Sequence, residues 1–191
     1  MTAGDLKTRQ ISRAQEAAPR FDFCLPCWCA ANTLTAKEFR LFPSVIWYVI
    51  RMSWDSYIDN LIAQTKDSSG VAHADKACII GMDGGAAWTS AGHANALKLQ
   101  GSEGANIAKC FKSKDFTAFM AGGIYAEGTK YQFLREEDGK LVLGKRKEHG
   151  AISMQCSKTA IVIAHTNEGG QQGNSNKGVG VIAEYLESLG M

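Results

Sequence analysis

The chain has 191 residues, a formal net charge of +2 at pH 7, 45% hydrophobic residues and 21% charged residues. These values are typical of a globular protein with one ordinary domain plus an extension. A net charge of +2 does not by itself indicate nucleic-acid binding. The longest apolar run, residues 41–50, is too short to span a bilayer, and residues 1–20 do not resemble a secretory signal. We therefore expect no transmembrane segment.

The composition changes near Arg51 and Met52. Residues 1–51 contain all three prolines and carry seven basic side chains against four acidic ones, whereas the remainder has fourteen basic and fifteen acidic side chains. This change predicts a boundary between an atypical N-terminal extension, 1–51, and a compact domain, 52–191. We expect the extension to be poorly ordered or at most locally helical. In an alternative interpretation, residues 1–51 are upstream sequence translated in frame with Met52.

The six cysteines divide evenly between the two parts. Cys78, Cys110 and Cys156 lie far apart in apolar contexts, which predicts buried thiols in a reducing compartment. Cys24-x-x-Cys27-x-Cys29 resembles a metal cluster but has no fourth ligand nearby. We therefore expect no metal site.

The sequence contains no arrangement typical of catalysis. Phosphate-binding, nucleophile-elbow, zinc-protease and dinucleotide-binding motifs are all missing. The histidines have no acidic or cysteine neighbours at ligand spacing, which predicts isolated surface side chains: His73, His93, His149 and His165. We expect a protein that is not an enzyme and needs no cofactor.

The first predicted element is a helix from residue 53. Ser53 is a suitable cap, and apolar residues recur at the spacing of one helical face: Trp54, Tyr57, Ile58, Leu61 and Ile62. Short elements follow, with strands predicted at 76–82, 87–91, 116–120 and 123–127 and a short helix at 106–111. The sequence Asp83-Gly84-Gly85 between apolar runs is a strong hairpin signal, because glycine accepts positive φ.

Two further hairpins and a helix complete the pattern. Residues 130–135 turn at Asp138-Gly139 into 140–144, and residues 151–156 turn at Ser157-Lys158 into 159–165. Residues 168–173 read as a loop, after which Asn174 or Ser175 caps a final helix with an apolar face. A helix, a run of antiparallel strands and a second helix predict an α+β fold with one central sheet.

Two groups of side chains leave alternatives open. Trp54, Tyr57, Trp88 and Tyr185 either pack in the core or form an aromatic groove for a polyproline II ligand, which needs flat apolar faces and donors for its free carbonyls. The cluster Lys145-Arg146-Lys147, with Lys130 and Arg135 on the neighbouring strand, is either a solvated hairpin edge or a contact for an acidic protein surface or phosphoinositide head groups.

Several ordered motifs resemble one known family. MSWDSYIDNL at 52–61 resembles the N-terminal signature of profilins, with its Trp-x-x-Tyr-[Ile/Val]-Asp pattern. CIIGMDGGAAWTSAG, AEGTKYQFLREEDGKLVLGKRK and SKTAIVIAHT resemble successive profilin strands, and NKGVGVIAEYLESLGM resembles the C-terminal helix. Residues 52–191 are most similar to invertebrate profilins. The resemblance implies a central antiparallel sheet flanked by helices, with the N- and C-terminal helices packed together on one side.

The resemblance also implies a function. A profilin is a non-enzymatic cytoplasmic protein that binds monomeric actin, regulates actin polymerisation and nucleotide exchange, and docks proline-rich partners. The implied polyproline-binding residues are Trp54, Tyr57, Trp88, Tyr185 and Leu189. The implied actin-binding residues are Lys130, Phe133, Arg135, Arg146, Gln171, Gly173, Asn176 and Lys177. The implied phosphoinositide-binding residues are Lys145, Arg146 and Lys147.

The chain departs from the family pattern at two places. Glu148 stands where many relatives have glycine after their basic cluster, so its carboxylate is expected to weaken binding of anionic lipids. The extension could obstruct the groove, and its apolar residues Ile46, Trp47 and Tyr48 lead us to expect partial autoinhibition of proline-rich binding. A disordered extension that touches nothing is the alternative. An alternative function is a peptide or lipid adaptor that has lost actin binding, in which the extension or Glu148 has altered the basic face while the aromatic groove has survived.

Overall fold

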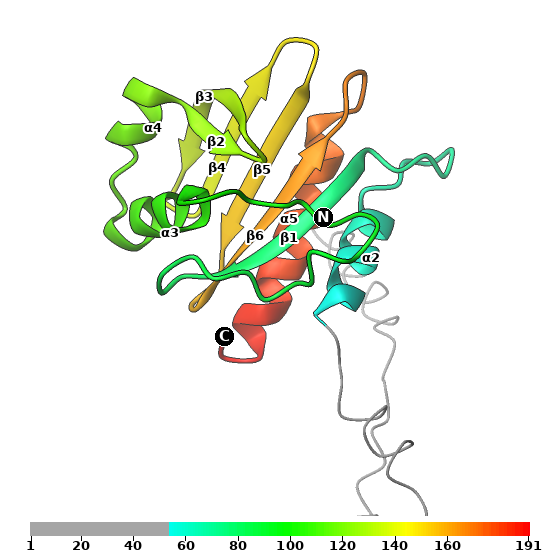
Figure 1. Ribbon diagram of the computed structural model, residues 1–191. Helices are drawn as coiled ribbons and strands as arrows, with labels where there is room; N and C mark the ends of the chain where they lie inside the picture. Colours follow the sequence, from blue (N-terminus) through cyan, green and yellow to red (C-terminus); the bar gives the residue numbers. More distant parts are fainter. Residues whose placement is uncertain (1–53) are drawn as a thin grey trace, which may run out of the picture. The chain divides into compact units, whose positions relative to one another are not determined.

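The computed structural model describes residues 54–191 as an antiparallel six-stranded sheet with helices on both faces (Figure 1). The strands lie in the order β1-β6-β5-β4-β3-β2. They are β1 (Ala74–Gly81), β2 (Ile124–Ala126), β3 (Thr129–Glu137), β4 (Leu141–Arg146), β5 (Gly150–Cys156) and β6 (Ala160–Thr166). The helices are α2 (Asp55–Gln64), α3 (Glu103–Ser113), α4 (Thr117–Gly122) and α5 (Gln172–Ser188). The predicted α+β class with one central sheet is confirmed.

The inner strand β6, next to β1, shows why the sheet is covered on both faces. Successive side chains of a strand point in opposite directions. Ile161 and Ile163 belong to the core shared with α3 and α4, whereas Val162 and Ala164 belong to the core shared with α2 and α5. All four side chains are fully buried. For this reason β6 reads in the sequence as a continuous apolar run instead of an alternating one.

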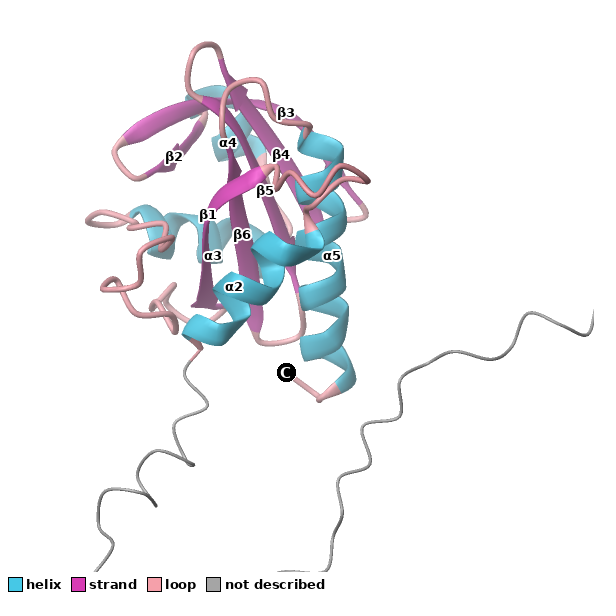
Figure 2. Cartoon of the chain, turned by 90° about the vertical axis from the view of Figure 1, so that its right-hand side faces the viewer, coloured by secondary structure: helices cyan, strands magenta, loops and turns pink. Residues whose placement is uncertain are grey.

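Helices α2 and α5 lie side by side on one face of the sheet, and α3 and α4 lie on the other (Figures 1 and 2). Their close approach requires a glycine in α5, since a Cβ atom at Gly178 would lie 2.6 Å from Cγ2 of Thr65 at the end of α2. Thr65 is itself buried, and its hydroxyl donates a hydrogen bond to the carbonyl of Ile62. The predicted packing of the two terminal helices is therefore confirmed.

Two of the predicted strands are wrong. Residues 116–120 lead into and form the first turn of α4, where Phe116 and Phe119 pack into the core at helical spacing. A short apolar run does not distinguish a strand from a buried helix. Residues 87–91 form no strand either. Ala87 makes an isolated bridge with Ile80, and the hydroxyl of Thr89 accepts a hydrogen bond from the amide of Ile79, so this loop covers the outer edge of β1.

The other predicted elements are present with shifted ends. Helix α3 is longer than the predicted 106–111, and α5 begins before Asn174. The turn at Asp138-Gly139 is confirmed: both residues have positive φ, 53° and 64°, which is typical of a two-residue hairpin turn. Ser53, the predicted cap of the first helix, lies outside the described residues, as do all predictions for the extension.

The three cysteines within residues 54–191 are free thiols, as predicted. Cys78 and Cys110 are buried, and Cys156 is half-buried. Burial raises the pKa of the Cys78 thiol to about 12. The cluster at Cys24, Cys27 and Cys29 lies outside the described residues.

The prediction for the histidines is wrong for His73, His93 and His165. A carboxylate oxygen lies 3.2 Å from Nε2 of His73, 3.3 Å from Nε2 of His93 and 2.6 Å from Nδ1 of His165. His73 is also buried, with 8% of its surface exposed. The acidic partner of His73 is Asp67, six residues earlier, whereas the partners of His93 and His165 are brought close by the fold, which spacing along the sequence does not show.

The turn that ends β1 is in backbone contact with α3. Gly85 has a φ of +69°, and a Cβ atom there would lie 2.1 Å from the carbonyl carbon of Gly104 in the first turn of α3. The neighbouring Gly84 has a similar φ of +76°, but a Cβ atom there would meet nothing within 4 Å. Of these two neighbouring glycines, only Gly85 therefore combines an unusual backbone conformation with a close approach.

We expect Gly85→Ala to lower the free energy of unfolding by about 4 kcal/mol or more, because the methyl group forces the turn and α3 apart. Gly84→Ala is the matched control, and it should cost only about 1–2 kcal/mol for the left-handed conformation. Urea denaturation of the full chain, followed by far-ultraviolet circular dichroism, measures both. Equal costs for the two variants would contradict the close contact.

His165 connects three segments of the sheet. Its Nδ1 lies 2.6 Å from Oδ1 of Asp75 in β1, and its Nε2 lies 2.8 Å from the carbonyl oxygen of His149 in the β4–β5 turn. Both partners accept hydrogen bonds, so the imidazolium, which donates from both nitrogens, satisfies this site. Burial lowers the pKa of His165, but the hydrogen bonds to Asp75 and His149 and the charge of Asp75 outweigh it, and the net pKa is raised. Burial raises the pKa of Asp75, but the hydrogen bond and the charge of His165 lower it by more. The net pKa of Asp75 is therefore lowered.

The signs of these shifts define a pH window. The raised pKa of His165 gives stability that is present below the unfolded pKa of about 6.5 and is lost as the pH rises through the folded pKa. The lowered pKa of Asp75 gives stability that is present above about pH 3.9 and is lost as the pH falls through the folded pKa. The pair therefore stabilises the fold most between about pH 4 and 6.5.

We expect His165→Ala to lower the free energy of unfolding more at about pH 5.5 than at about pH 9, measured by urea denaturation. His149→Ala is the control, because it removes an exposed ring and keeps the carbonyl that His165 contacts. The control should have little effect at either pH. A loss on His165→Ala that is the same at both pH values would show that the ion pair does not contribute.

Candidate binding surfaces

Four aromatic rings form a continuous row over α2 and α5. The ring centroids of Trp88 and Trp54 are 4.7 Å apart, those of Trp54 and Tyr57 are 5.3 Å apart, and those of Tyr57 and Tyr185 are 6.3 Å apart. Each separation lies in the range in which aromatic rings attract one another. The structure thus brings together four predicted groove residues from three segments of the chain. We call these four residues the aromatic row.

The rings of the aromatic row are both packed and accessible. Trp54, Tyr57 and Trp88 are partly buried and pack against the core between α2, α5 and the sheet. Tyr185 is 50% exposed, and Leu189, one turn later, is 52% exposed. Core packing therefore accounts for part of Trp54, Tyr57 and Trp88, whereas the use of the row as a groove stays a prediction.

The hydroxyl of Tyr57 is suited to donating a hydrogen bond. Burial, and then the charge of a nearby Tyr185 phenolate, raise the pKa of Tyr57 above its ordinary value of 10.0. The phenol therefore stays protonated at neutral pH. A row of flat rings with Tyr and Trp donors fits a polyproline II peptide, which exposes carbonyl oxygens without internal hydrogen bonds.

Trp88 is placed by the outer edge of β1. Its backbone amide donates a hydrogen bond of 2.8 Å to the carbonyl of Ile79. Its Nε1 lies 3.0 Å from the position that a Cβ atom of Gly81 would occupy. The indole thus packs over a glycine of β1, and a larger residue at Gly81 would displace it.

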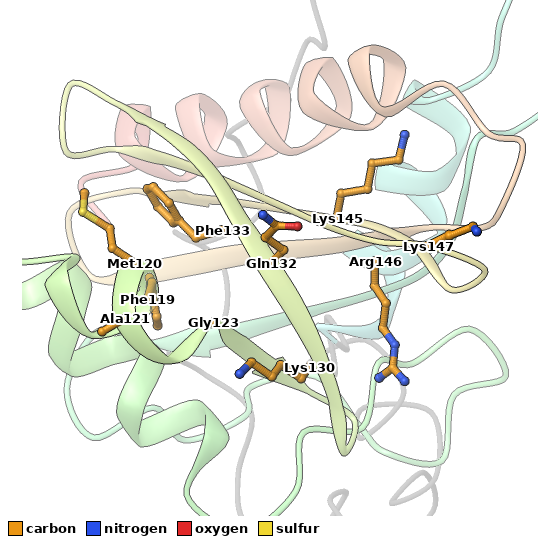
Figure 3. Close-up of a pocket in the computed structure, with 10 residues that line it drawn as sticks. All are labelled: Phe119, Met120, Ala121, Gly123, Lys130, Gln132, Phe133, Lys145, Arg146 and Lys147. Atoms are coloured by element: carbon orange, nitrogen blue, oxygen red, sulfur yellow. The ribbon is translucent and has the colours of Figure 1, made fainter.

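A second surface lies at the other end of the sheet. A shallow pocket of about 390 Å³ opens between α4 and the strands β3 and β4 (Figure 3). Among the residues predicted to bind actin, Lys130, Phe133 and Arg146 line it. The pocket combines basic side chains with an apolar wall and thus suits a partner surface that is both acidic and apolar. We call it the basic pocket.

Sequence reasoning missed several residues of the basic pocket: Phe119, Met120, Ala121, Gly123 and Gln132. Three of them lie in α4, which the sequence analysis predicted as a strand. Asp115 accepts a hydrogen bond of 3.0 Å from the amide of Thr117, a local turn that commonly begins a helix. This acidic residue before the spacing Phe116-x-x-Phe119 was a signal that could have identified the helix.

Four more of the predicted actin-binding residues gather at the start of α5: Gln171, Gly173, Asn176 and Lys177. Hydrogen bonds fix this end of the helix on the sheet. The side-chain amide of Gln172 donates to the carbonyls of Gly144, at 3.3 Å, and Ile152, at 3.2 Å. Oδ1 of Asn176 accepts a hydrogen bond of 2.6 Å from the hydroxyl of Ser153.

Arg135 is not part of the basic pocket. It lies further along β3, opposite Leu143 of β4, and its guanidinium forms an ion pair of 2.9 Å with Glu137 on the same strand. Among the predicted actin-binding residues, Arg135 therefore lies apart from the two groups described above.

Lys145, Arg146 and Lys147 all line the basic pocket, but their side chains do not point to one place. Lys145 and Arg146 point in opposite directions from β4, and Lys147 follows in the turn (Figure 3). All three side chains are exposed. Glu148 lines a second pocket with them, so its carboxylate shares their surroundings.

Among residues 54–191, no group of three or more His, Cys, Asp or Glu side chains is arranged to hold a metal ion. In the same part of the chain, no helix has the length and apolar character needed to cross a membrane.

Comparison with known proteins identifies the family. The profilin family model matches residues 52–191. Over 140 residues, the chain is 82% identical to the profilin of Clypeaster japonicus, 79% identical to that of Heliocidaris crassispina and 76% identical to that of Suberites domuncula. Each match covers 73% of this chain and 100% of the relative. The predicted resemblance to profilins is confirmed, and these three relatives are invertebrate proteins.

Solved structures agree with this result. Acanthamoeba castellanii profilin Ib matches with a TM-score of 0.58 and 28% identity, over 73% of this chain and 100% of its own. Mouse profilin IIa, solved with a double repeat from the FH1 domain of mDia1, shares the fold with a TM-score of 0.53 and 22% identity, over 72% of this chain and 99% of its own. Over residues 52–191, this chain belongs to the profilin family.

Proposed function

We propose that this profilin is a non-enzymatic regulator of actin polymerisation in the cytoplasm and binds actin and proline-rich peptides on different surfaces. The assignment of the two ligands to two surfaces rests on the separate positions of the aromatic row and the basic pocket. The aromatic row lies over α2 and the C-terminal part of α5, whereas the basic pocket lies at α4, β3 and β4. No residue is shared between the aromatic row and the basic pocket, so both ligands have room to bind at once.

The proline-rich ligand lies along the aromatic row, and Leu189 extends the surface. Polyproline II peptides present prolines on flat faces, and aromatic rings pack against them with little loss of entropy because the ligand is already extended. Tyr57 and the indole nitrogens of Trp54 and Trp88 supply donors for its carbonyls. The partial burial of Trp54, Tyr57 and Trp88 supports this role, since these three rings pack against the core and still keep accessible surface.

Actin binds over the basic pocket and the start of α5. The residues assigned to it are Lys130, Phe133, Arg135, Arg146, Gln171, Gly173, Asn176 and Lys177. The anchoring of α5 on β4 and β5 through Gln172 supports this assignment, because it fixes the α5 residues relative to the strands. In this position the protein covers the barbed-end face of an actin monomer, blocks spontaneous nucleation and favours exchange of ADP for ATP.

Phosphoinositides compete with actin for the basic surface. Lys145, Arg146 and Lys147 supply the charge, and Arg146 is common to both assignments. Glu148 reduces the affinity for anionic head groups, because its carboxylate lies in the same pocket as these basic side chains. An adaptor that has lost actin binding is not favoured, because the relatives match along their whole length at 76–82% identity.

We expect Trp54→Ala to weaken binding of polyproline by at least about 30-fold, because a central aromatic anchor contributes about 2 kcal/mol or more. Binding of actin monomers should remain, because the basic pocket is not touched. Phe133→Ala is the matched control, with the opposite pattern expected: weaker actin binding and normal polyproline binding. Calorimetry with a polyproline peptide and with actin measures both. Loss of the same ligand in both variants would refute the two-surface assignment.

We expect Lys177→Glu to slow actin association, and to do so more at low salt than at high salt, because exposed charges act through screened attraction. Lys98→Glu is the control, since it makes the same change of charge at an exposed position in the loop before α3. Stopped-flow association rates at two ionic strengths give the comparison. If the two variants associate equally fast at low salt, Lys177 does not belong to the actin-binding surface.

A further inference from the structure

Two carboxylates of α2 hold the loop that follows Trp88. Oδ1 of Asp55 accepts a hydrogen bond of 2.7 Å from the backbone amide of Ser90. One helical turn later, Oδ1 of Asp59 lies 3.3 Å from Nε2 of His93. Residues four apart lie on the same side of a helix, so the two acidic side chains face the same loop. Neither residue belongs to the surfaces assigned above.

The same loop is fastened to β1 on its other side. Nδ1 of His93 accepts a hydrogen bond of 3.2 Å from the amide of Asn95, so the other ring nitrogen, Nε2, is the one that faces Asp59. The side-chain amide of Asn95 donates 2.8 Å to the carbonyl of Asp75, and its own carbonyl accepts 2.9 Å from the amide of Ala77. Residues 88–95 thus form a strap that joins α2 to the outer edge of the sheet.

The strap holds the segment that directly follows Trp88 against α2. Trp88 precedes Ser90 by two residues, and its ring meets the ring of Trp54 at 4.7 Å. The edge of β1 fixes the backbone of Trp88, and the strap adds a connection from the segment after Trp88 to α2. A groove whose rings are in place before the ligand arrives binds more tightly, because the ligand does not have to order them.

We propose that Asp55 and Asp59 are positioning residues for proline-rich ligands: together they clamp the loop 88–95 against α2, so that Trp88 completes the aromatic row. The two carboxylates act through the loop and do not touch the ligand. The proposal rests on the proposed function, because it explains how the proline-rich surface is kept ready. It adds that loop–helix contacts, and not only the aromatic residues, determine affinity.

The test measures the affinity of the full 191-residue chain for a synthetic decaproline peptide by calorimetry. The double variant Asp55→Ala with Asp59→Ala should bind about tenfold more weakly, because it removes the hydrogen bond that a carboxylate accepts from Ser90 and the polar contact with His93. The double variant Asp55→Asn with Asp59→Asn should stay within about twofold of wild type, because each side chain keeps an oxygen that faces the same loop and can accept from it. Actin affinity should be unchanged in both variants.

Asp115→Ala is the matched control, because it also removes a carboxylate that accepts a backbone hydrogen bond, but near α4, and it should bind the peptide normally. Asp59→Ala alone covers the case in which the double alanine variant does not fold. The side chain of Asp59 is 69% exposed, so we expect this single variant to bind decaproline only about threefold more weakly.

Two results for decaproline affinity would overturn the clamp. The first is alanine variants that fold and bind like wild type. The second is asparagine variants that bind as weakly as the alanine variants, since the negative charge at the start of α2 would then be the cause. A wild-type chain that fails to bind decaproline would overturn the proposed proline-rich function itself, and the clamp with it.

Discussion

The close packing of α2 against α5 is the contact on which the rest of this structure depends. Gly178 lets α5 approach Thr65 at the end of α2, and a side chain there would separate the helices. The aromatic row exists only because the two helices meet, since Tyr57 comes from one and Tyr185 from the other. The glycine at position 178 thus allows a surface to form that joins Tyr57, 121 positions earlier in the sequence, to Tyr185, 7 positions later.

Helix α5 also takes part in both proposed surfaces. Its start is fixed on β4 and β5 through Gln172, next to the residues assigned to actin. Its last turn carries Tyr185, and Leu189 directly follows its end. A helix rises about 1.5 Å per residue, so Lys177 and Tyr185 are about 12 Å apart along the axis. This separation suits a protein that holds two partners at the same time, because one rigid element sets the distance between them.

Local patterns predicted much of the fold and part of the surfaces. The hairpin at Asp138-Gly139 depends on φ angles that glycine and aspartate adopt readily, so it was visible in the sequence. Helix α4 and the loop after β1 were mispredicted, because short apolar runs carry no clear period. With α4 missed, Phe119 and Met120 of the basic pocket were missed as well. The boundary near Arg51 and Met52 stays a prediction, although the family match also begins at residue 52.

The sequence by itself determined the family, the α+β class and the aromatic residues, because these follow from motifs and from short-range spacing. Only the tertiary structure decided which side chains meet. The ion pair of His165 with Asp75 joins residues 90 positions apart, and the contact of Asp55 with Ser90 joins residues 35 positions apart. The alternation of a strand shows that a side chain faces one side of the sheet, but not what lies there. That depends on how the strands are ordered, and strand order is set by packing of the whole chain.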